Sequence, residues 1–97
     1  MKIRFIENIE EKESISRTIL TQLPEWFGLP DSTNEYIQNS KTMPFWVCLD
    51  EDKPIGFIAL KATSDFTAEI YVMGVLKEYH RKGYILEIGE KLKNKGF

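Results

Sequence analysis

The sequence predicts an α/β fold of the mixed α+β type, with the element order β-α-α-β-β-β-α. Three observations predict it. Apolar residues recur at helical spacing in the first part of the chain, and three runs rich in β-branched and aromatic residues follow. The last of these runs leads through a basic turn and a glycine into a second helical pattern. Because no repeat, low-complexity tract or linker divides the chain, residues 1–97 are predicted to form a single domain.

The first elements are a short β-type run over residues 2–6 and a helix after it. Asn8 with Glu11 three residues later is a helix-start signature, because the Asn side chain can accept a hydrogen bond from a backbone N–H of the first turn. Pro24 is predicted to end this helix. Three apolar residues recur at helical spacing on its buried face: Ile15, Ile19 and Leu23.

The loop over residues 25–30 carries two aromatic side chains, Trp26 and Phe27. Core packing or an interface is the favoured interpretation, and a place in an acceptor pocket is the alternative. Ser32 with Glu35 forms a second capping box, which predicts the start of a second, shorter helix.

The second half of the chain has the pattern of strands. Residues 43–50 and 54–62 predict a hairpin around the polar turn at residues 50–53. Residues 67–76 predict a third long strand, rich in β-branched and aromatic residues. The final segment predicts a helix with three apolar residues on one face, Ile85, Ile88 and Leu92.

Composition and charge exclude several classes of function. A chain that is 42% hydrophobic and 29% charged is ordinary for a globular protein and unlike a disordered one. With 13 basic and 15 acidic residues the net charge is −2, which gives no general attraction to nucleic acid or to an anionic membrane. The longest apolar runs are far shorter than a membrane span, and the start of the chain has no signal-peptide pattern. We therefore expect a cytoplasmic protein with no nucleic-acid or membrane partner.

One cysteine and one histidine leave little scope for redox or metal chemistry. Cys48 alone forms neither an internal disulfide nor a multi-cysteine zinc site, and it is expected to be a small buried hydrophobe. His80 cannot build a metal site alone, so no metal is expected. With Arg81 and Lys82 beside it, contact with a phosphate is its favoured role.

The stretch over residues 67–83 combines a strand, a basic turn, a glycine and the start of a helix. A helix N-terminus offers backbone N–H groups and the positive end of a dipole, and glycine lets the backbone approach a phosphate closely. This arrangement permits a phosphate or another anion but does not identify the ligand.

Residues 75–83, VLKEYHRKG, resemble the acetyl-CoA signature of the GNAT superfamily of N-acetyltransferases. In that signature a strand ends in a hydrophobic-valine pair, and a Gln/Arg-x-x-Gly-x-Gly/Ala sequence opens a helix. His80 stands at the Gln/Arg position and Gly83 at the first glycine. The hairpin is similar to the second and third strands of the family, and the resemblance covers the whole chain.

The resemblance implies that acetyl-CoA is the co-substrate and that the amine of a small molecule or of a peptide accepts the acetyl group. It also implies that the fourth strand pairs with the pantetheine arm and that an N–H of this strand stabilises the tetrahedral oxyanion. Gly74 fits a β-bulge that aims such an N–H outward, and packing alone is the alternative reason for a glycine there. The implied cofactor-binding residues are Met73, Gly74, Val75, His80, Arg81, Lys82, Gly83 and Tyr84.

Glu69 is the candidate general base. In the histone-acetyltransferase branch of the family an Ala-Glu-Ile step on the fourth strand supplies the base, eleven residues before the Gln/Arg position, and Ala-Glu-Ile at residues 68–70 has the same spacing from His80. An alkylamine is protonated at neutral pH and must lose a proton before it can attack a thioester. Tyr71 and Met73 are expected on the same strand face, where they would raise the pKa of the carboxyl group. The alternative is a solvated strand residue.

Two departures from the family pattern leave a second interpretation open. Ile85 stands where the signature has its second small residue, and the resemblance implies that the chain stops after the pyrophosphate-loop helix, before a fifth strand. The chain is therefore an active N-acetyltransferase or a catalytically impaired CoA-binding or structural remnant. In either case we expect a homodimer joined near the open edge of the fourth strand and the last helix, or failing that an aggregation-prone monomer.

Overall fold

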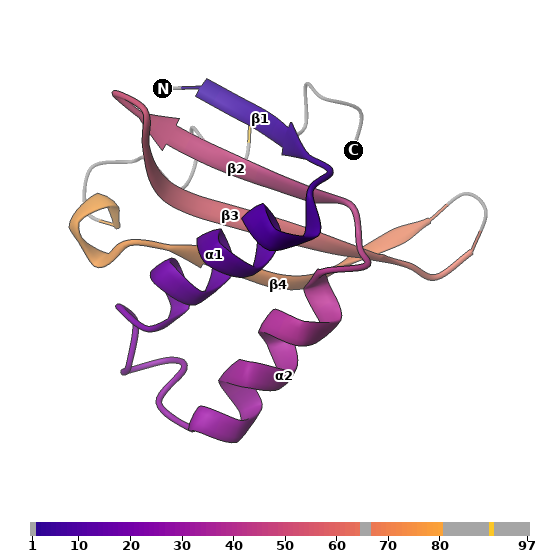
Figure 1. Ribbon diagram of the computed structural model, residues 1–97, viewed down its shortest axis with the longest axis horizontal. Coiled ribbons are helices and arrows are strands. Elements are labelled where there is room, and N and C mark those ends of the chain that lie inside the picture. Colours follow the sequence, from indigo (N-terminus) through magenta and orange to yellow (C-terminus); the bar gives the residue numbers. More distant parts are fainter. Residues whose placement is uncertain (1, 65–66, 81–89, 91–97) are drawn as a thin grey trace.

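The computed structural model describes residues 2–64, residues 67–80 and Glu90 (Figure 1). Within these ranges four strands form one antiparallel sheet in the order β1-β2-β3-β4. Two helices, α1 and α2, cover one face of this sheet (Figure 1). The elements are β1 (Lys2–Ile6), α1 (Ile9–Leu20), α2 (Pro30–Ser40), β2 (Phe45–Asp50), β3 (Lys53–Ala62), β4 (Ala68–Val75) and the short 3-10 helix η1 (Lys77–Tyr79).

The predicted fold class and element order are confirmed from β1 to β4. The predicted last helix lies outside the described residues, apart from Glu90, which is helical. The hairpin is also confirmed, since Asp50 pairs with Lys53 and the chain turns through Glu51 and Asp52. Both turn residues have positive φ, 50° and 67°, as a two-residue hairpin turn of the primed type requires.

The helix boundaries depart from the prediction in two places. The N-cap of α1 is Asn8 as predicted, and its Oδ1 accepts the backbone N–H of Glu11 at 3.0 Å. This helix ends at Leu20 rather than at Pro24, although Leu23 is still buried. The capping box at Ser32 is wrong, because α2 begins two residues earlier with Pro30 in its first turn. Proline suits that position, since its ring fixes a helical φ and its missing N–H has no helical partner there.

A β-bulge in β4 lies at Tyr71 and not at Gly74. Ala59 of β3 pairs with Val72 and the next residue, Leu60, pairs with Ile70, so Tyr71 is the extra residue of β4. Gly74 pairs regularly with Phe57. The predicted bulge at Gly74 is therefore wrong.

Close packing explains the glycine at position 74 instead. A Cβ there would lie 3.2 Å from side-chain atoms of Ile19, Leu20 and Phe57. Such contacts are tighter than nine in ten Cβ contacts in proteins, so a side chain here would push its neighbours, and α1 lies close against the backbone of β4 at this point.

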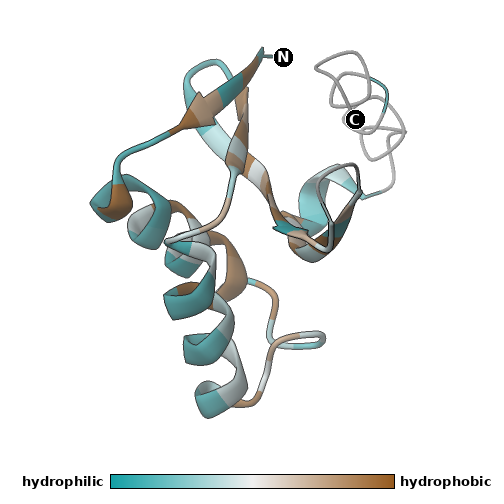
Figure 2. Ribbon diagram, turned by 90° about the vertical axis from the view of Figure 1, so that its right-hand side faces the viewer, coloured by the Kyte–Doolittle hydropathy of each residue, from teal (hydrophilic) through white to brown (hydrophobic). Residues whose placement is uncertain are grey.

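The hydrophobic core fills the space between the helices and the sheet. The helices are predominantly hydrophilic (Figure 2), and the apolar residues that they bury are Ile19, Leu20 and Ile37. The most deeply buried side chains are Ile19, Leu20, Ile37, Phe45, Val47, Ile55 and Leu76. Cys48 is 2% exposed, as expected for a small buried hydrophobe.

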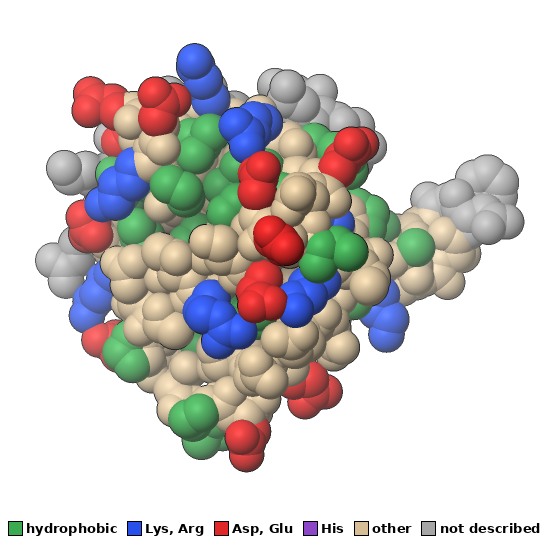
Figure 3. Space-filling model, in the orientation of Figure 1, with side chains coloured by type: hydrophobic (Ala, Val, Ile, Leu, Met, Phe, Trp, Pro, Cys, Tyr) green, Lys and Arg blue, Asp and Glu red, His purple; other side chains and the backbone are tan. Residues whose placement is uncertain are grey.

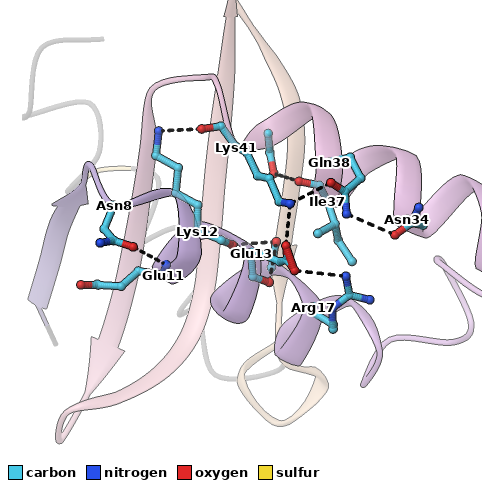
Figure 4. A network of polar contacts seen from close by, with 11 residues as sticks. Asn8, Glu11, Lys12, Glu13, Arg17, Asn34, Ile37, Gln38 and Lys41 are labelled. Atoms are coloured by element: carbon cyan, nitrogen blue, oxygen red, sulfur yellow. Dashed lines mark hydrogen bonds and ion pairs between the residues drawn. The ribbon is translucent and has the colours of Figure 1, made fainter.

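Polar contacts between α1 and the C-terminal end of α2 fix the two helices relative to each other (Figure 4). The side chain of Lys12 is buried, and its Nζ donates to the carbonyl oxygens of Lys41 at 3.2 Å and Met43 at 2.9 Å. Glu13 pairs with Lys41 at 2.5 Å and with Arg17 at 3.6 Å. The hydrogen bond from Lys41 and its positive charge hold the pKa of Glu13 below its usual value, and Arg17 adds to this effect. On the face of the molecule seen in Figure 3, acidic and basic side chains are interspersed.

Lys12→Met should lower the free energy of unfolding by about 1–3 kcal/mol, because two part-buried carbonyl groups lose their donor. Urea unfolding followed by circular dichroism measures this. Lys41→Met is the matched control, since it removes the partner of Glu13 but keeps the backbone carbonyl that Lys12 contacts.

The depressed pKa of Glu13 means that its ion pairs stabilise the fold above its ordinary pKa of 4.5 and lose this effect as the pH falls. The control should therefore cost less than Lys12→Met at neutral pH and lose its effect in acid. Equal losses for the two variants would contradict the role of Lys12.

Candidate functional site

A cleft lies at the edge of β4, where the strand ends. Its volume is about 260 Å³. The segment after α1 supplies one wall, and the end of β4 with the residue after η1 supplies the other. The lining residues are Leu23, Trp26, Phe27, Met73, Gly74, Val75 and His80. Four residues that the sequence marks as cofactor-binding, at positions 73–75 and 80, therefore lie together in one cleft.

The backbone of β4 presents hydrogen-bonding groups at the edge that borders the cleft. Within the described ranges β4 pairs only with β3, so its other edge carries no strand. The Nε2 of His80 donates to the carbonyl oxygen of Val75 at 2.6 Å, and the N–H of Leu76 donates to Ile55 of β3 at 2.8 Å. The carbonyl of Val75 thus points away from β3. Because these directions alternate along a strand, the N–H groups of Met73 and Val75 also point outward, whereas Gly74 faces β3.

Two contacts join the walls at the end of the cleft. The rings of Trp26 and His80 meet edge to face, with centroids 5.3 Å apart. Beside them, Lys77 Nζ forms an ion pair with Glu25 Oε1 at 2.6 Å. Both contacts connect the loop between the helices to the segment that follows β4, so they set the width of the cleft at this end.

Trp26 and Phe27 have different environments. Core packing or an interface is the favoured expectation, and core packing holds for Phe27, which is half-buried against the core. Trp26 is not packed in the core, since it is 56% exposed, and an interface at this residue stays a prediction. Both residues line the cleft, so a place in an acceptor pocket also stays open for them. Thr33 Oγ1 donates to the carbonyl of Phe27 at 2.8 Å, which ties the loop to α2.

A row of aromatic rings extends from the cleft along α2 to β4. Phe27 contacts Tyr36 with ring centroids 5.8 Å apart, and Tyr36 contacts Tyr71 at 5.6 Å, both edge to face. Asn39 Nδ2 donates to the hydroxyl of Tyr71 at 2.8 Å. We call these four residues, Phe27, Tyr36, Asn39 and Tyr71, the aromatic wall. Sequence reasoning missed it as a site, because its members come from three separate segments and share no local motif.

Glu69 lies further along β4, beyond the bulge. It is exposed and stands opposite Lys61 in the register. The apolar surroundings expected for it are not found among the described residues. The extra residue at Tyr71 changes the alternation of the strand, so Met73 lies on the opposite face from Glu69, contrary to the expectation. Tyr71 contacts α2 on the helix-covered face.

The end of the basic turn, from residue 81, and the helix after it, apart from Glu90, lie outside the described residues. The predicted phosphate contacts Arg81, Lys82, Gly83 and Tyr84, and also Ile85, lie outside the described residues. Over residues 2–64, 67–80 and 90, no group of three or more His, Cys, Asp or Glu side chains is arranged to hold a metal ion. In the same ranges no helix has the length and hydrophobicity needed to cross a membrane.

Comparison with known sequences decides the family. The profile of the Acetyltransferase (GNAT) family matches residues 8–96, a range that includes both helices and the strands that form the cleft. The chain belongs to this family. A comparison with curated proteins found no significant match.

Solved structures of acetyltransferases share the GNAT fold of this chain. A possible acetyltransferase from Clostridium difficile 630 is 21% identical with a TM-score of 0.61, over 96% of this chain and 68% of that one. The PaiA N-acetyltransferase from Thermoplasma acidophilum, in complex with coenzyme A, is 20% identical with a TM-score of 0.59, over 99% and 75%. An aminoglycoside acetyltransferase from an uncultured soil metagenomic sample is 20% identical with a TM-score of 0.60, over 98% and 70%. At these identities the likeness establishes the fold.

The two lining aromatics of this GNAT chain should differ in their effect on stability. Phe27→Ala should lower the free energy of unfolding by about 1–3 kcal/mol, because a half-buried ring leaves the core. Trp26→Ala should change it by less than about 1 kcal/mol, because an exposed ring gains little from folding. Chemical denaturation of both variants tests this, and a larger loss for Trp26→Ala would show that its ring is packed in the folded protein.

Proposed function

We propose that this GNAT protein is an acetyl-CoA-dependent N-acetyltransferase that transfers the acetyl group to an amine by direct attack in a ternary complex. The observation that carries the proposal is the edge of β4, where the outward N–H groups of Met73 and Val75 border an otherwise mainly apolar cleft. The coenzyme A complex of PaiA, a protein of the same fold, supports coenzyme A as the carrier.

The residues around the cleft fit the parts of acetyl-CoA. The pantetheine arm has amide groups that can pair with the open edge of β4 at Met73 and Val75, as an added strand does. His80 borders the same cleft. The pyrophosphate would be held by backbone N–H groups and positive charge at the turn that follows, from Arg81, Lys82, Gly83 and Tyr84. Acetyl-CoA supplies the activated thioester.

The reaction needs an uncharged amine and a stabilised oxyanion. Glu69 accepts a proton from the ammonium form of the acceptor, and the amine nitrogen then attacks the thioester carbon. An outward N–H of Met73 or Val75 donates to the oxygen that becomes negative in the tetrahedral intermediate. The C–S bond breaks as the amide forms, and the second proton lost by the nitrogen ends on the departing thiolate. The first proton passes from Glu69 to water, which returns the carboxylate to its starting state. The products are an N-acetylated amine and free coenzyme A.

Calorimetric titration with acetyl-CoA tests the ligand. We expect binding that weakens by more than about tenfold in Gly83→Val, because a side chain there keeps the phosphate away from the backbone. Arg81→Ala should weaken binding and reduce its dependence on salt, since a surface phosphate contact is screened. An unchanged affinity in Gly83→Val would contradict this placement of the phosphates, and no binding of acetyl-CoA by the unaltered chain would refute the proposed function.

Glu69→Gln tests the base. The substitution should lower turnover by about 10²-fold or more while the affinity for acetyl-CoA stays the same, because the amide cannot accept the proton. Lowering the pH should reduce turnover of the unaltered protein in the same way. Release of the CoA thiol, followed with a thiol reagent, measures both effects. A Glu69→Gln variant with full activity and an unaltered pH profile would make Glu69 a solvated strand residue.

A second proposal concerns the homodimer. β4 carries no strand on its outer side within the described ranges, and Ile70 on this strand is 60% exposed. An open edge strand with an exposed apolar side chain is a template for pairing with a second chain. A symmetric dimer through the part of this edge around Ile70 is the outcome that such a surface favours, which leaves the N–H groups of Met73 and Val75 to the pantetheine arm. The same surface would serve a catalytically impaired CoA-binding or structural remnant, which is the alternative function of the chain.

Light scattering coupled to size exclusion measures the oligomeric state. The unaltered chain should elute as a dimer and Ile70→Lys as a monomer, because a lysine on an edge strand opposes pairing. Leu29→Lys is the matched control, since Leu29 is 71% exposed and lies in the loop before α2. If the unaltered chain stays monomeric at high concentration and unfolds cooperatively on heating, the proposed dimer is refuted.

A further inference from the structure

The order of groups along β4 indicates where an acceptor would bind. The cleft borders residues 73–75, the bulge places Tyr71 next, and Glu69 follows two residues later. A group bound at Tyr71 would thus lie between the cleft, where the thioester carbon is proposed to sit, and the proposed base. The aromatic wall stands at this place and is continuous with the cleft, because Phe27 belongs to both.

The aromatic wall offers a ligand three aromatic rings and one hydroxyl group. Phe27, Tyr36 and Tyr71 are half-buried, so their rings offer apolar surface without being sealed in the core. The hydroxyl of Tyr71 accepts a hydrogen bond from Asn39, and its own hydrogen can be donated to a ligand. Ring faces attract a single ammonium group as well as apolar groups.

The charges around the wall argue against an acceptor with many positive charges. None of the described residues that line the cleft or form the aromatic wall carries a carboxylate. Glu25, next to Trp26, is paired with Lys77. An acceptor with several ammonium groups needs several carboxylates to offset the loss of hydration, and among the described residues beside the aromatic wall Glu69 is the one that the proposed reaction uses.

We infer that the acceptor is a primary amine on an aromatic or aliphatic body, and that the aromatic wall binds this body beside the bulge of β4. The inference rests on the proposed N-acetyltransferase function and names its substrate class. The reaction is the acyl transfer described above, so it needs no further reactant. Tyr36 and Tyr71 contact the body of the acceptor, and its amino group points toward Glu69.

Acceptor selectivity tests the inference directly. With acetyl-CoA and the full chain, 2-phenylethylamine and hexylamine should each have a kcat/KM more than about tenfold above that of kanamycin or spermidine, which carry several charges. Titration of 2-phenylethylamine into the protein with coenzyme A present measures binding separately, so the test does not depend on turnover. A preference for kanamycin or spermidine, in rate or in binding, would overturn the inference and leave the proposed function intact. Failure to bind acetyl-CoA would overturn both.

Two variants locate the acceptor. Tyr36→Leu keeps an apolar side chain but removes the ring, and it should raise the KM or Kd for 2-phenylethylamine by about tenfold while the affinity for acetyl-CoA stays the same. Tyr71→Phe keeps the ring and should raise the KM or Kd for 2-phenylethylamine by a smaller factor. Phe5→Ala is the matched control, because Phe5 is an exposed aromatic residue whose ring contacts Trp46. Circular dichroism confirms folding of each variant. An unchanged KM in folded Tyr36→Leu, or an equal rise in Phe5→Ala, would show that the acceptor binds elsewhere.

Discussion

The contact of α1 with the bare backbone of β4 is the constraint on which the rest of the structure depends. At Gly74 a Cβ would lie only 3.2 Å from side-chain atoms of Ile19 and Leu20, so the helix would have to shift by a few tenths of an ångström to admit it. The end of α1 is therefore held against the last part of the strand, and the loop that follows the helix emerges beside the edge of β4. Trp26 and Phe27 come next in the chain, so their place at the cleft follows from this contact. A larger residue at position 74 would move the helix and the cleft wall together.

Local sequence signals were sufficient for most of the fold. The cap at Asn8, the turn at residues 50–53 and the β-rich runs each act over a few residues, and each was placed correctly. The signal at Ser32 failed because Pro30 competes with it and suits the first turn of a helix better. The boundary at Pro24 was too late because the chain leaves α1 through turns before it reaches the proline.

The site was only partly predictable, for a physical reason. Residues 73–75 and His80 are close in sequence, so the family signature marked them together. The bulge was assigned to Gly74 because glycine is a common bulge residue, but here the missing side chain serves helix packing and the bulge falls on Tyr71. The aromatic wall depends on contacts between α2 and β4 that only the tertiary structure creates. No periodicity in the sequence reports such a contact.

His80 donates a hydrogen bond to the carbonyl of Val75 at the outer edge of β4. A ligand that binds this carbonyl therefore replaces a hydrogen bond that the protein already makes. A strand-like ligand that uses the same carbonyl must displace the imidazole and part it from Trp26. The chain thus contains its own competitor at high effective concentration, since the imidazole is tethered only five residues away. The apparent affinity is the intrinsic affinity multiplied by the fraction of molecules in which the imidazole has swung away. Release is helped by the same group, because the returning imidazole satisfies the carbonyl that the departing ligand leaves behind.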